Sequence, residues 1–345
     1  MDLGCIFFLS TYCVQLLEFS TVELSIAMFF VNTINNLVKK IKTIYHKFIR
    51  PVRDKIKGTS PPSPPPIHYA TKPPTDTAAN NFCPPSAHST YWHPVFHPST
   101  PIWTYFEQMT GADGWGNNEL QNYTRSPVNS FFTPDNKLVV RAISRPDALE
   151  DKYTSARLVS KQKLDRARGY LTARLTVPCA RGIWPAFWLL PAEPCTWPTD
   201  GEIDIFESWN GLNINHSCLH WGHYNAEDSQ KHRVMESNLG SPNLIQEFSL
   251  AWEQASEQSL QSGRLLWYQN GLPVMRASIP EGIRPLRDFR IILNVAIGGN
   301  VCQGVLPAAG VYDLVVHDIR MSEEPRGGWE KFRSDWDKTS EGNTM

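Results

Sequence analysis

The sequence Gly201-Glu202-Ile203-Asp204-Ile205-Phe206-Glu207-Ser208-Trp209 sets three carboxylates among Ile and Phe side chains. Side chains of a β-strand alternate between the two faces of a sheet, so Glu202 and Asp204 share one face. Continued alternation would turn Glu207 to the opposite face. A β-bulge, which adds one residue to a strand, would bring Glu207 back beside the other two acids. The sequence leaves open whether Ile205 or Phe206 bulges.

Three acids that share a cavity indicate acid/base chemistry. Like charges held close together raise the pKa of at least one carboxyl, which then keeps a proton near neutral pH. A proton donor of this kind is what general acid catalysis needs. The alternative is an edge strand that carries three solvated acids. The upstream run 182–191 is also apolar and contains Trp184 and Trp188, and two such runs joined by a short turn are typical of neighbouring strands in a buried sheet.

Short apolar stretches punctuated by Gly, Pro, Asn and Asp follow one another after about residue 88. We predict strands at 137–143, 156–160, 169–177, 186–190, 202–207, 215–220, 246–252, 265–269, 289–295 and 310–321. Such regular short strands favour an all-β sandwich. Asn270-Gly271 predicts a hairpin turn, because both residues tolerate positive φ. From Arg326 onward the sequence is polar, which predicts a loose tail.

The N-terminal part differs from the rest in composition. Residues 3–38 are apolar, but charged and polar residues keep every uninterrupted run below the roughly 20 residues of a membrane helix. Only Asp2 precedes this run, whereas a secretory signal opens with basic residues. Residues 39–57 carry eight Lys or Arg and one Asp, a pattern compatible with a basic helix at a membrane surface or in solvent. If residues 3–38 did cross a membrane, this basic flank would favour a cytoplasmic C-terminal side, which conflicts with secretion.

Composition and segment boundaries together suggest four parts. Residues 1–58 form an apolar and then basic segment, helical or membrane-associated. Residues 59–88 form a Pro-rich linker, because proline at this density favours extended polyproline II. Residues 89–325 form the catalytic domain, and residues 326–345 form the polar tail.

Net charge, aromatic content and cysteine spacing restrict the classes of ligand that the protein is expected to bind. The formal net charge of −1 and the pI of about 6.8 give no field that would attract nucleic acid. The 12 Trp, 11 Tyr and 16 Phe suggest stacking on sugar rings, although core filling explains part of them. Cysteines 179, 195, 218 and 302 fit no zinc spacing and are either free thiols or disulfides. The sequons at Asn122 and Asn215 are typical of a secreted chain.

Five motifs in order along the chain resemble glycoside hydrolase family 16. They are residues 115–121, 153–157, 184–191, 200–207 and 294–300. The likeness covers roughly residues 105–322 and is greatest to laminarinase-like endo-β-1,3(4)-glucanases of the fungal type. One departure is the segment 91–114, which is Pro- and His-rich where relatives carry a recognisable first strand; together with the unusual N-terminus it suggests either an incorrect gene start or a degenerate first strand at the edge of the sandwich.

The resemblance implies a concanavalin-like β-jelly-roll of two curved antiparallel sheets and a retaining double displacement. In this sequence Glu202 corresponds to the nucleophile, Glu207 to the acid/base, and Asp204 to the residue that orients and tunes the nucleophile. Retention requires carboxyl groups about 5–5.5 Å apart. A flat strand separates residues five apart by about 16 Å, so only curvature and a bulge could bring the two Glu together. No metal ligand and no cofactor is implied; a structural calcium ion on the convex face cannot be read from these residues.

The resemblance also suggests substrate contacts. The candidates are Trp184, Trp188, His220, Trp221, Asn117, Asn118 and Arg157. The two indoles of 184 and 188 would be floors for glucosyl rings, or part of the core. His220 would bond a catalytic carboxylate or be structural. Arg157 would bind sugar hydroxyls or form an ion pair with Glu119.

The expected function is hydrolysis of β-1,3 or mixed β-1,3/1,4 glucan by a monomeric enzyme. A cell-wall transglycosylase using the same site and a non-catalytic β-glucan-binding protein are the alternatives. The expected location is extracellular or associated with the cell wall or membrane.

Overall fold

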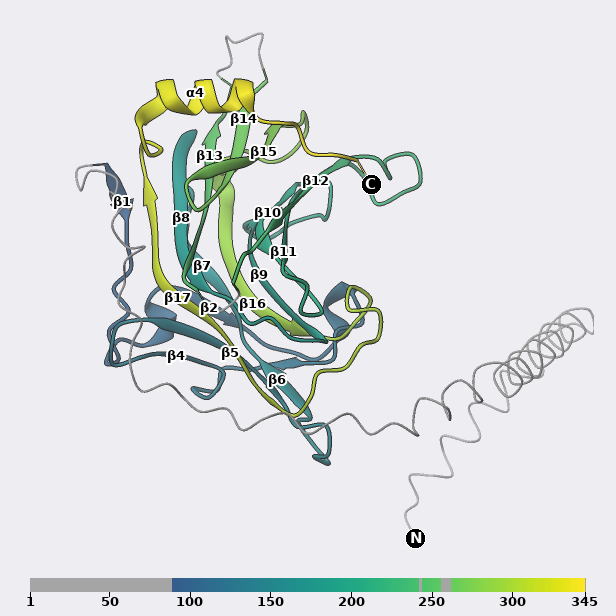
Figure 1. Ribbon diagram of the computed structural model, residues 1–345. Coiled ribbons are helices and arrows are strands. Elements are labelled where there is room, and N and C mark those ends of the chain that lie inside the picture. The colour runs from purple at the N-terminus through teal and green to yellow at the C-terminus, as the bar shows by residue number, and fades with distance from the viewer. Residues whose placement is uncertain (1–88, 242–243, 256–261, 345) are drawn as a thin grey trace, which may run out of the picture. The chain divides into compact units, whose positions relative to one another are not determined.

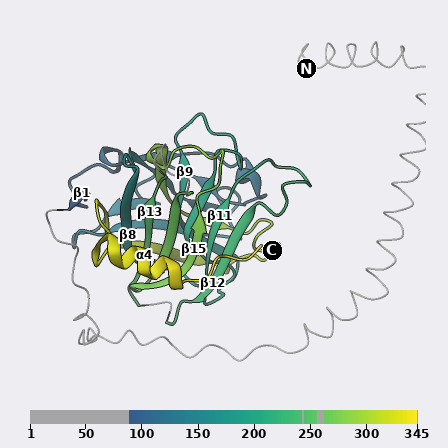
Figure 2. The same ribbon diagram turned by 90° about the horizontal axis from the view of Figure 1, so that it is seen from above.

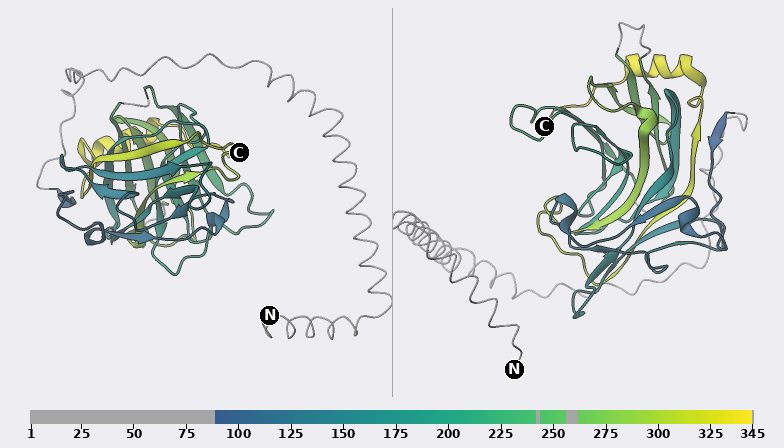
Figure 3. Two further views of the ribbon diagram at one scale, coloured as in Figure 1. Left: turned by 90° about the horizontal axis from the view of Figure 1, so that it is seen from below. Right: turned by 180° about the vertical axis from the view of Figure 1, so that it is seen from behind.

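The computed structural model describes residues 89–241, 244–255 and 262–344 (Figure 1). The N-terminal segment 1–58 and the linker 59–88, predicted above, lie outside these residues. Two sheets pack face to face, and their strands bend along their length, as the view from behind in Figure 3 also shows. All strand pairs are antiparallel except β3 with β6. The predicted sandwich of two curved antiparallel sheets is thus confirmed.

The larger sheet has ten strands in the order β15-β14-β13-β8-β17-β5-β6-β3, with β1 added on β17 and β4 on β5. Its strands are β1 (Thr90–Trp92), β3 (Asn122–Tyr123), β4 (Ser130–Phe132), β5 (Leu138–Ser144), β6 (Tyr153–Ser155), β8 (Arg168–Thr176), β13 (Gln246–Glu253), β14 (Arg264–Gln269), β15 (Leu272–Ser278) and β17 (Gly310–Ser322).

The smaller sheet has seven strands in the order β12-β11-β10-β9-β16-β7-β2 and lies inside the curve of the larger one (Figure 1). Its strands are β2 (Phe106–Met109), β7 (Arg157–Lys163), β9 (Ile183–Pro191), β10 (Glu202–Glu207), β11 (Ile214–His220), β12 (His232–Asn238) and β16 (Phe289–Ile297). Three short 3-10 turns lie between strands: η3 (Ile102–Thr104), η4 (Gly114–Gly116) and η5 (Leu286–Asp288).

Large apolar side chains from both sheets fill the space between them. Phe187 of β9 and Phe206 of β10 meet Phe248 and Trp267 of the larger sheet, and all four are fully buried. The rings of Phe206 and Phe248 lie 4.7 Å apart. Burying side chains of this size contributes roughly 1.5–3 kcal/mol each. The other face of the smaller sheet is left open for polar groups.

The ten predicted strands are all present, with ends shifted by a few residues. The predicted hairpin turn joins β14 to β15, with φ of 51° at Asn270 and 77° at Gly271. Seven strands were not predicted, because most span only two to four residues and β12 is largely polar. At the start of the segment 91–114, β1 (Thr90–Trp92) pairs with β17, and within the segment β2 forms the edge beside β7.

The loose tail predicted from Arg326 onward is wrong. Helix α4 (Gly328–Lys338) lies across the larger sheet, as the view from above in Figure 2 shows. Trp329 and Phe332 pack on Tyr170, Ala251, Leu266 and Tyr268 of the outer sheet face, with Trp336 beside them. The segment reads as polar because only the residues three and four apart on one helix face are apolar.

The residues after α4 join the edge strands of the two sheets. Arg276 of β15 bonds the backbone of Ser340 and Gly342, and Val234 of β12 exchanges two backbone bonds with Asn343, each 2.8 Å long. An uncovered edge strand exposes unpaired backbone groups to other chains. The C-terminal segment therefore closes one end of the sandwich. Among the described residues, no helix has the length and apolar character that crossing a membrane requires.

We expect Phe332→Ala to destabilise the domain by about 3–5 kcal/mol, because it removes a fully buried ring between α4 and the sheet. The melting temperature should fall by roughly 10 °C in differential scanning calorimetry. Ser334→Ala, on the exposed side of the same helix, is the matched control and should change it little. Equal melting temperatures for Phe332→Ala and the unmodified chain would show that α4 does not stabilise the sandwich.

Candidate active site

The bulge predicted in the acidic strand is present, and Ile205 is its extra residue. Across β9, Asp204 pairs with Trp188 and Phe206 pairs with the next residue, Phe187, which leaves Ile205 without a partner. Both Ile205 and Phe206 belong to the core between the sheets. Glu207, at the end of β10, therefore lies on the same open face of the sheet as Glu202 and Asp204.

Buried side chains hold the backbone of the bulge. Asn215 of β11 accepts the N–H of Glu207 at 3.0 Å and donates to the carbonyl of Ile205 at 3.4 Å. The indole of Trp267, from the opposite sheet, donates to the carbonyl of Asp204 at 2.9 Å. These bonds satisfy backbone groups that the irregular ladder leaves unpaired. Since Asn215 is 1% exposed, its sequon cannot carry a glycan in the folded chain.

Each catalytic candidate has a distinct partner. Trp197 Nε1 donates to Glu202 Oε2 at 3.0 Å, and Trp184 Nε1 donates to Glu207 Oε1 at 2.6 Å. The third acid, Asp204, has His220 Nε2 at 3.5 Å from its Oδ2. Both Glu side chains are half-buried, whereas Asp204 is 3% exposed. The indole bonds fix the direction of both Glu carboxyl groups.

Burial raises the pKa of all three acids, and repulsion between them adds to the shift for Glu202 and Glu207. Burial, followed by the charge of Asp204, raises the pKa of Glu202, while His220 and Arg157 oppose this shift. Burial also raises the pKa of Asp204. The pKa of Glu207 is raised well above its usual range by burial and then by the charges of Asp204 and Glu202. Glu207 therefore keeps its proton near neutral pH.

Trp188 and Arg157 lie together on the open face. Trp188 is half-buried, and its Nε1 donates to Asn294 Oδ1 at 2.7 Å. The Arg157 guanidinium lies 4.6 Å from the Trp188 ring centre and 5.0 Å from that of Trp115. Arg157 thus stacks on indoles, and in the part of the chain that the structure describes Glu119 accepts hydrogen bonds from Gln121 and Tyr123 instead. Its role in binding sugar stays a prediction.

Trp184 lies mostly inside the protein. Its side chain is 9% exposed and packs with Cys302 and Ala296, so little of the ring is open to a ligand. The hydrogen bond to Glu207 is the contribution that the structure shows for this residue.

The two predicted asparagines lie in the turn before β3. Asn118 is exposed, with φ of 53°, and donates to Asn300 Oδ1 at 3.0 Å. Asn117 accepts the N–H of Asn300 at 2.7 Å through its backbone carbonyl. This pairing ties the turn to the loop after β16; contact of either side chain with sugar stays a prediction.

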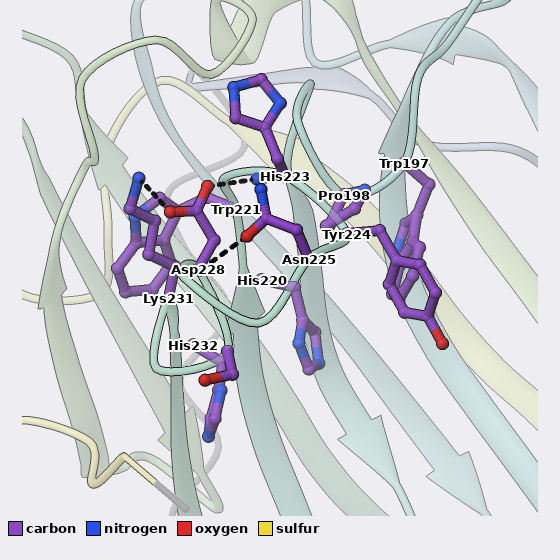
Figure 4. A pocket seen from close by; sticks show the side chains of 11 residues that line it. Trp197, Pro198, His220, Trp221, His223, Tyr224, Asn225, Asp228, Lys231 and His232 are labelled. Atoms are coloured by element: carbon purple, nitrogen blue, oxygen red, sulfur yellow. Dashed lines mark hydrogen bonds and ion pairs between the residues drawn. The ribbon is translucent and has the colours of Figure 1, made fainter.

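A cavity of about 340 Å³ opens beside the strand that carries the candidate acids (Figure 4). Its walls include Trp197, His220, Trp221 and Tyr224, and the last of these is 84% exposed. The rings of Trp197 and Tyr224 lie 5.5 Å apart. A second cavity of about 570 Å³ shares Trp221 and adds Arg233 and Glu341. Aromatic walls of this kind suit flat apolar faces of a ligand.

Several residues of the site were not predicted from the sequence. They are Asn215, Trp197, Asn294, Trp267 and Tyr224. Trp197 stands five residues before Glu202, and its proximity to the acidic stretch was the one available signal. The role of Asn215 depends on strand register, which a single sequence does not show.

Comparison with known proteins agrees with this geometry. Residues 103–261 match the family model described as "XgeA-like, catalytic GH16 domain". A beta-glucanase of Rhodothermus marinus is 32% identical over 245 residues, which cover 65% of this chain and 80% of that protein. The chain belongs to glycoside hydrolase family 16.

Two further proteins are similar to this family 16 chain. The clotting factor G alpha subunit of Tachypleus tridentatus is 33% identical, and the match covers 64% of this chain but 33% of that protein. The solved laminarinase from Rhodothermus marinus has a TM-score of 0.56 at 27% identity and covers 68% of this chain and 97% of that chain. The fungal subdivision suggested by the motifs stays a prediction.

The four cysteines of the described domain are free thiols: Cys179 and Cys195 are half-buried, while Cys218 and Cys302 are buried. Among them Cys218 lies opposite Asp204 on the acidic face. The thiol of Cys218, the imidazole of His220 and the carboxylate of Asp204 are the one metal-compatible group found in the described part of this family 16 domain.

Glu207→Gln should stabilise the family 16 domain at alkaline pH but not at acid pH. The pKa of Glu207 is higher in the folded chain than in the unfolded chain. As pH rises above about 4.5, the unfolded chain loses this proton first, so ionisation favours unfolding. Gln cannot ionise. The melting temperature of the variant relative to the unmodified chain should therefore rise by a few degrees between pH 4 and pH 8.

Glu150→Gln, at an exposed position, is the control and should give a difference that does not change with pH. A constant offset for Glu207→Gln at both pH values would contradict the raised pKa.

Proposed function

We propose that the chain is a retaining endo-β-glucanase that hydrolyses β-1,3 or mixed β-1,3/1,4 glucan by double displacement. The observation that carries this proposal is the bulge at Ile205, which gathers Glu202, Asp204 and Glu207 on one open face. The names of the similar proteins, a beta-glucanase and a laminarinase, support the substrate class.

In the first step Glu202 attacks the anomeric carbon while Glu207 protonates the departing glycosidic oxygen, which leaves a sugar covalently bound to Glu202. Trp197 holds the attacking carboxylate through Oε2. Trp184 donates to Oε1 of Glu207, so Oε2 is the oxygen that carries the transferable proton.

In the second step Glu207 acts as a base, removes a proton from water, and the water attacks the anomeric carbon and releases Glu202. The electrostatics favour this change of role. Once Glu202 is esterified, one of the two negative charges that raised the pKa of Glu207 is lost, and its proton has already gone to the leaving group. The charge of Asp204 remains to stabilise the cation-like transition state.

The two alternatives have less support. A protein that only binds glucan has no use for two oriented, proton-tuned Glu carboxyl groups. A transglycosylase would share the covalent intermediate, and acceptor sugars added to the product assay distinguish transfer from hydrolysis.

We also propose an extracellular or wall- or membrane-associated location, because a glucan polymer is reached there. The N-terminal apolar and basic residues 1–57 motivate this proposal. The sequon at Asn122 remains compatible with it, whereas that at Asn215 no longer supports it.

Glu202→Ala should abolish release of reducing ends from laminarin, by about 10⁴-fold or more, while laminarin binding is largely retained. Azide is small enough for the space left by the carboxylate, and it should restore cleavage of an aryl β-gluco-oligosaccharide with formation of an α-glycosyl azide. Glu227→Ala, an exposed acid near the cavity, is the matched control and should retain activity. Full activity of Glu202→Ala would exclude Glu202 as the nucleophile.

The product should be released as the β-anomer, because two successive inversions at the anomeric carbon restore the original configuration. Proton NMR of laminarin or lichenan digestion at early times measures this directly. An α-anomer that appears first would show a single displacement instead.

A further inference from the structure

A thiol, an imidazole and a carboxylate converge on the floor of the acidic face. Cys218 and His220 are two residues apart on β11 and therefore point to the same side of the sheet. The strand register sets Cys218 directly opposite Asp204. One ligand atom from each of these residues lies within 4.8 Å of the other two.

One of these atoms lacks a hydrogen-bond partner. Asp204 Oδ2 is buried and, among the described residues, accepts no hydrogen bond, although His220 Nε2 lies 3.5 Å away. Asp204 is 3% exposed and Cys218 is 5% exposed. A buried polar atom left in this way costs roughly 1–3 kcal/mol. The proposed glucanase mechanism needs the charge of Asp204 but assigns no partner to this oxygen.

The donor set selects one class of ligand. Sulfur, imidazole nitrogen and carboxylate oxygen together suit zinc and its heavier congener cadmium, whereas calcium and magnesium prefer oxygen ligands only. Two nitrogen or oxygen ligands of a tetrahedral zinc ion lie roughly 3.3 Å apart. The 3.5 Å between His220 Nε2 and Asp204 Oδ2 is close to this spacing.

The site also has a route of entry. The His220 side chain is 29% exposed and forms part of the wall of the 340 Å³ cavity beside Trp197 and Trp221 (Figure 4). An ion could therefore reach the buried oxygen and sulfur past His220. The fourth coordination position would face the cavity and take a water molecule.

We propose that Asp204, Cys218 and His220 form an inhibitory binding site for a thiophilic divalent cation of the zinc type. Binding displaces the thiol proton of Cys218 to solvent and joins the metal to sulfur, nitrogen and oxygen. The ion neutralises Asp204 and occupies the floor between the two catalytic Glu. It thereby removes the negative charge that the acid pair depends on and excludes the sugar.

Binding of Cd²⁺ and Zn²⁺ to the full chain tests this directly. The unmodified protein should show an ultraviolet sulfur-to-cadmium charge-transfer band that saturates at one equivalent of Cd²⁺. We assign this band to the bond between Cd²⁺ and the thiolate of Cys218. Cys218→Ser should lose this band and bind Zn²⁺ at least about tenfold more weakly in calorimetry. Cys302→Ser, a second buried free thiol outside the site, is the matched control and should bind like the unmodified protein. Unchanged binding by Cys218→Ser would overturn the proposal.

A second measurement needs no variant. Zinc X-ray absorption of the unmodified protein with one equivalent of Zn²⁺ should show one sulfur neighbour at about 2.3 Å together with nitrogen or oxygen. A shell of nitrogen and oxygen alone would overturn the proposal. Laminarin hydrolysis should be inhibited and then restored by a chelator, with each variant compared to itself without metal. Because binding is measured without substrate, a failure of the glucanase proposal would be separate from a failure of the metal site.

Discussion

The active site depends on one irregularity, the bulge at Ile205 in strand β10 of the smaller sheet. Without the extra residue Glu207 would point into the core, where an unpaired charge is prohibitively costly. Asn215 holds the bulge from the neighbouring strand, and Trp267 holds it from the opposite sheet. The packing of the two sheets therefore also determines how the three acids are aligned. A change that separates the sheets would also separate the acids.

The acid cluster opposes folding while it enables chemistry. Three carboxyl groups share a partly dry face; burial raises the pKa of each, and repulsion raises those of Glu202 and Glu207 further. Two indole N–H groups, from Trp184 and Trp197, stabilise the oxygens of the flanking Glu without adding positive charge. Neutral donors orient a carboxyl group yet shift its pKa less than a Lys or Arg would. This choice keeps a proton on Glu207, which an ion pair would have removed.

The sequence was sufficient for the features that have a local signal. Period-two alternation reveals most strands, and the spacing of Glu202, Asp204 and Glu207 predicts a bulge once the three acids are taken to share one face. Features that depend on register or on distant segments were not accessible. The sequence predicted a glycosylation sequon at Asn215, because the contact that buries this side chain, with Glu207, lies on the neighbouring strand. Helix α4 was predicted to be a loose tail, because its few apolar residues are buried only by packing on the outer face of the sheet.

The same reasoning explains why cysteine spacing was uninformative about metals. Zinc patterns in sequence require ligands close together along the chain, whereas Asp204 meets Cys218 and His220 only through the pairing of β10 with β11. The pairing that places His220 beside the catalytic acids also places the thiol there, since residues two apart on a strand share a face. A catalytic floor made of carboxylates and an imidazole needs only one sulfur to become a competent ligand set for zinc. In this chain Cys218 is that sulfur, so the strand geometry that supports catalysis also provides the means to block it.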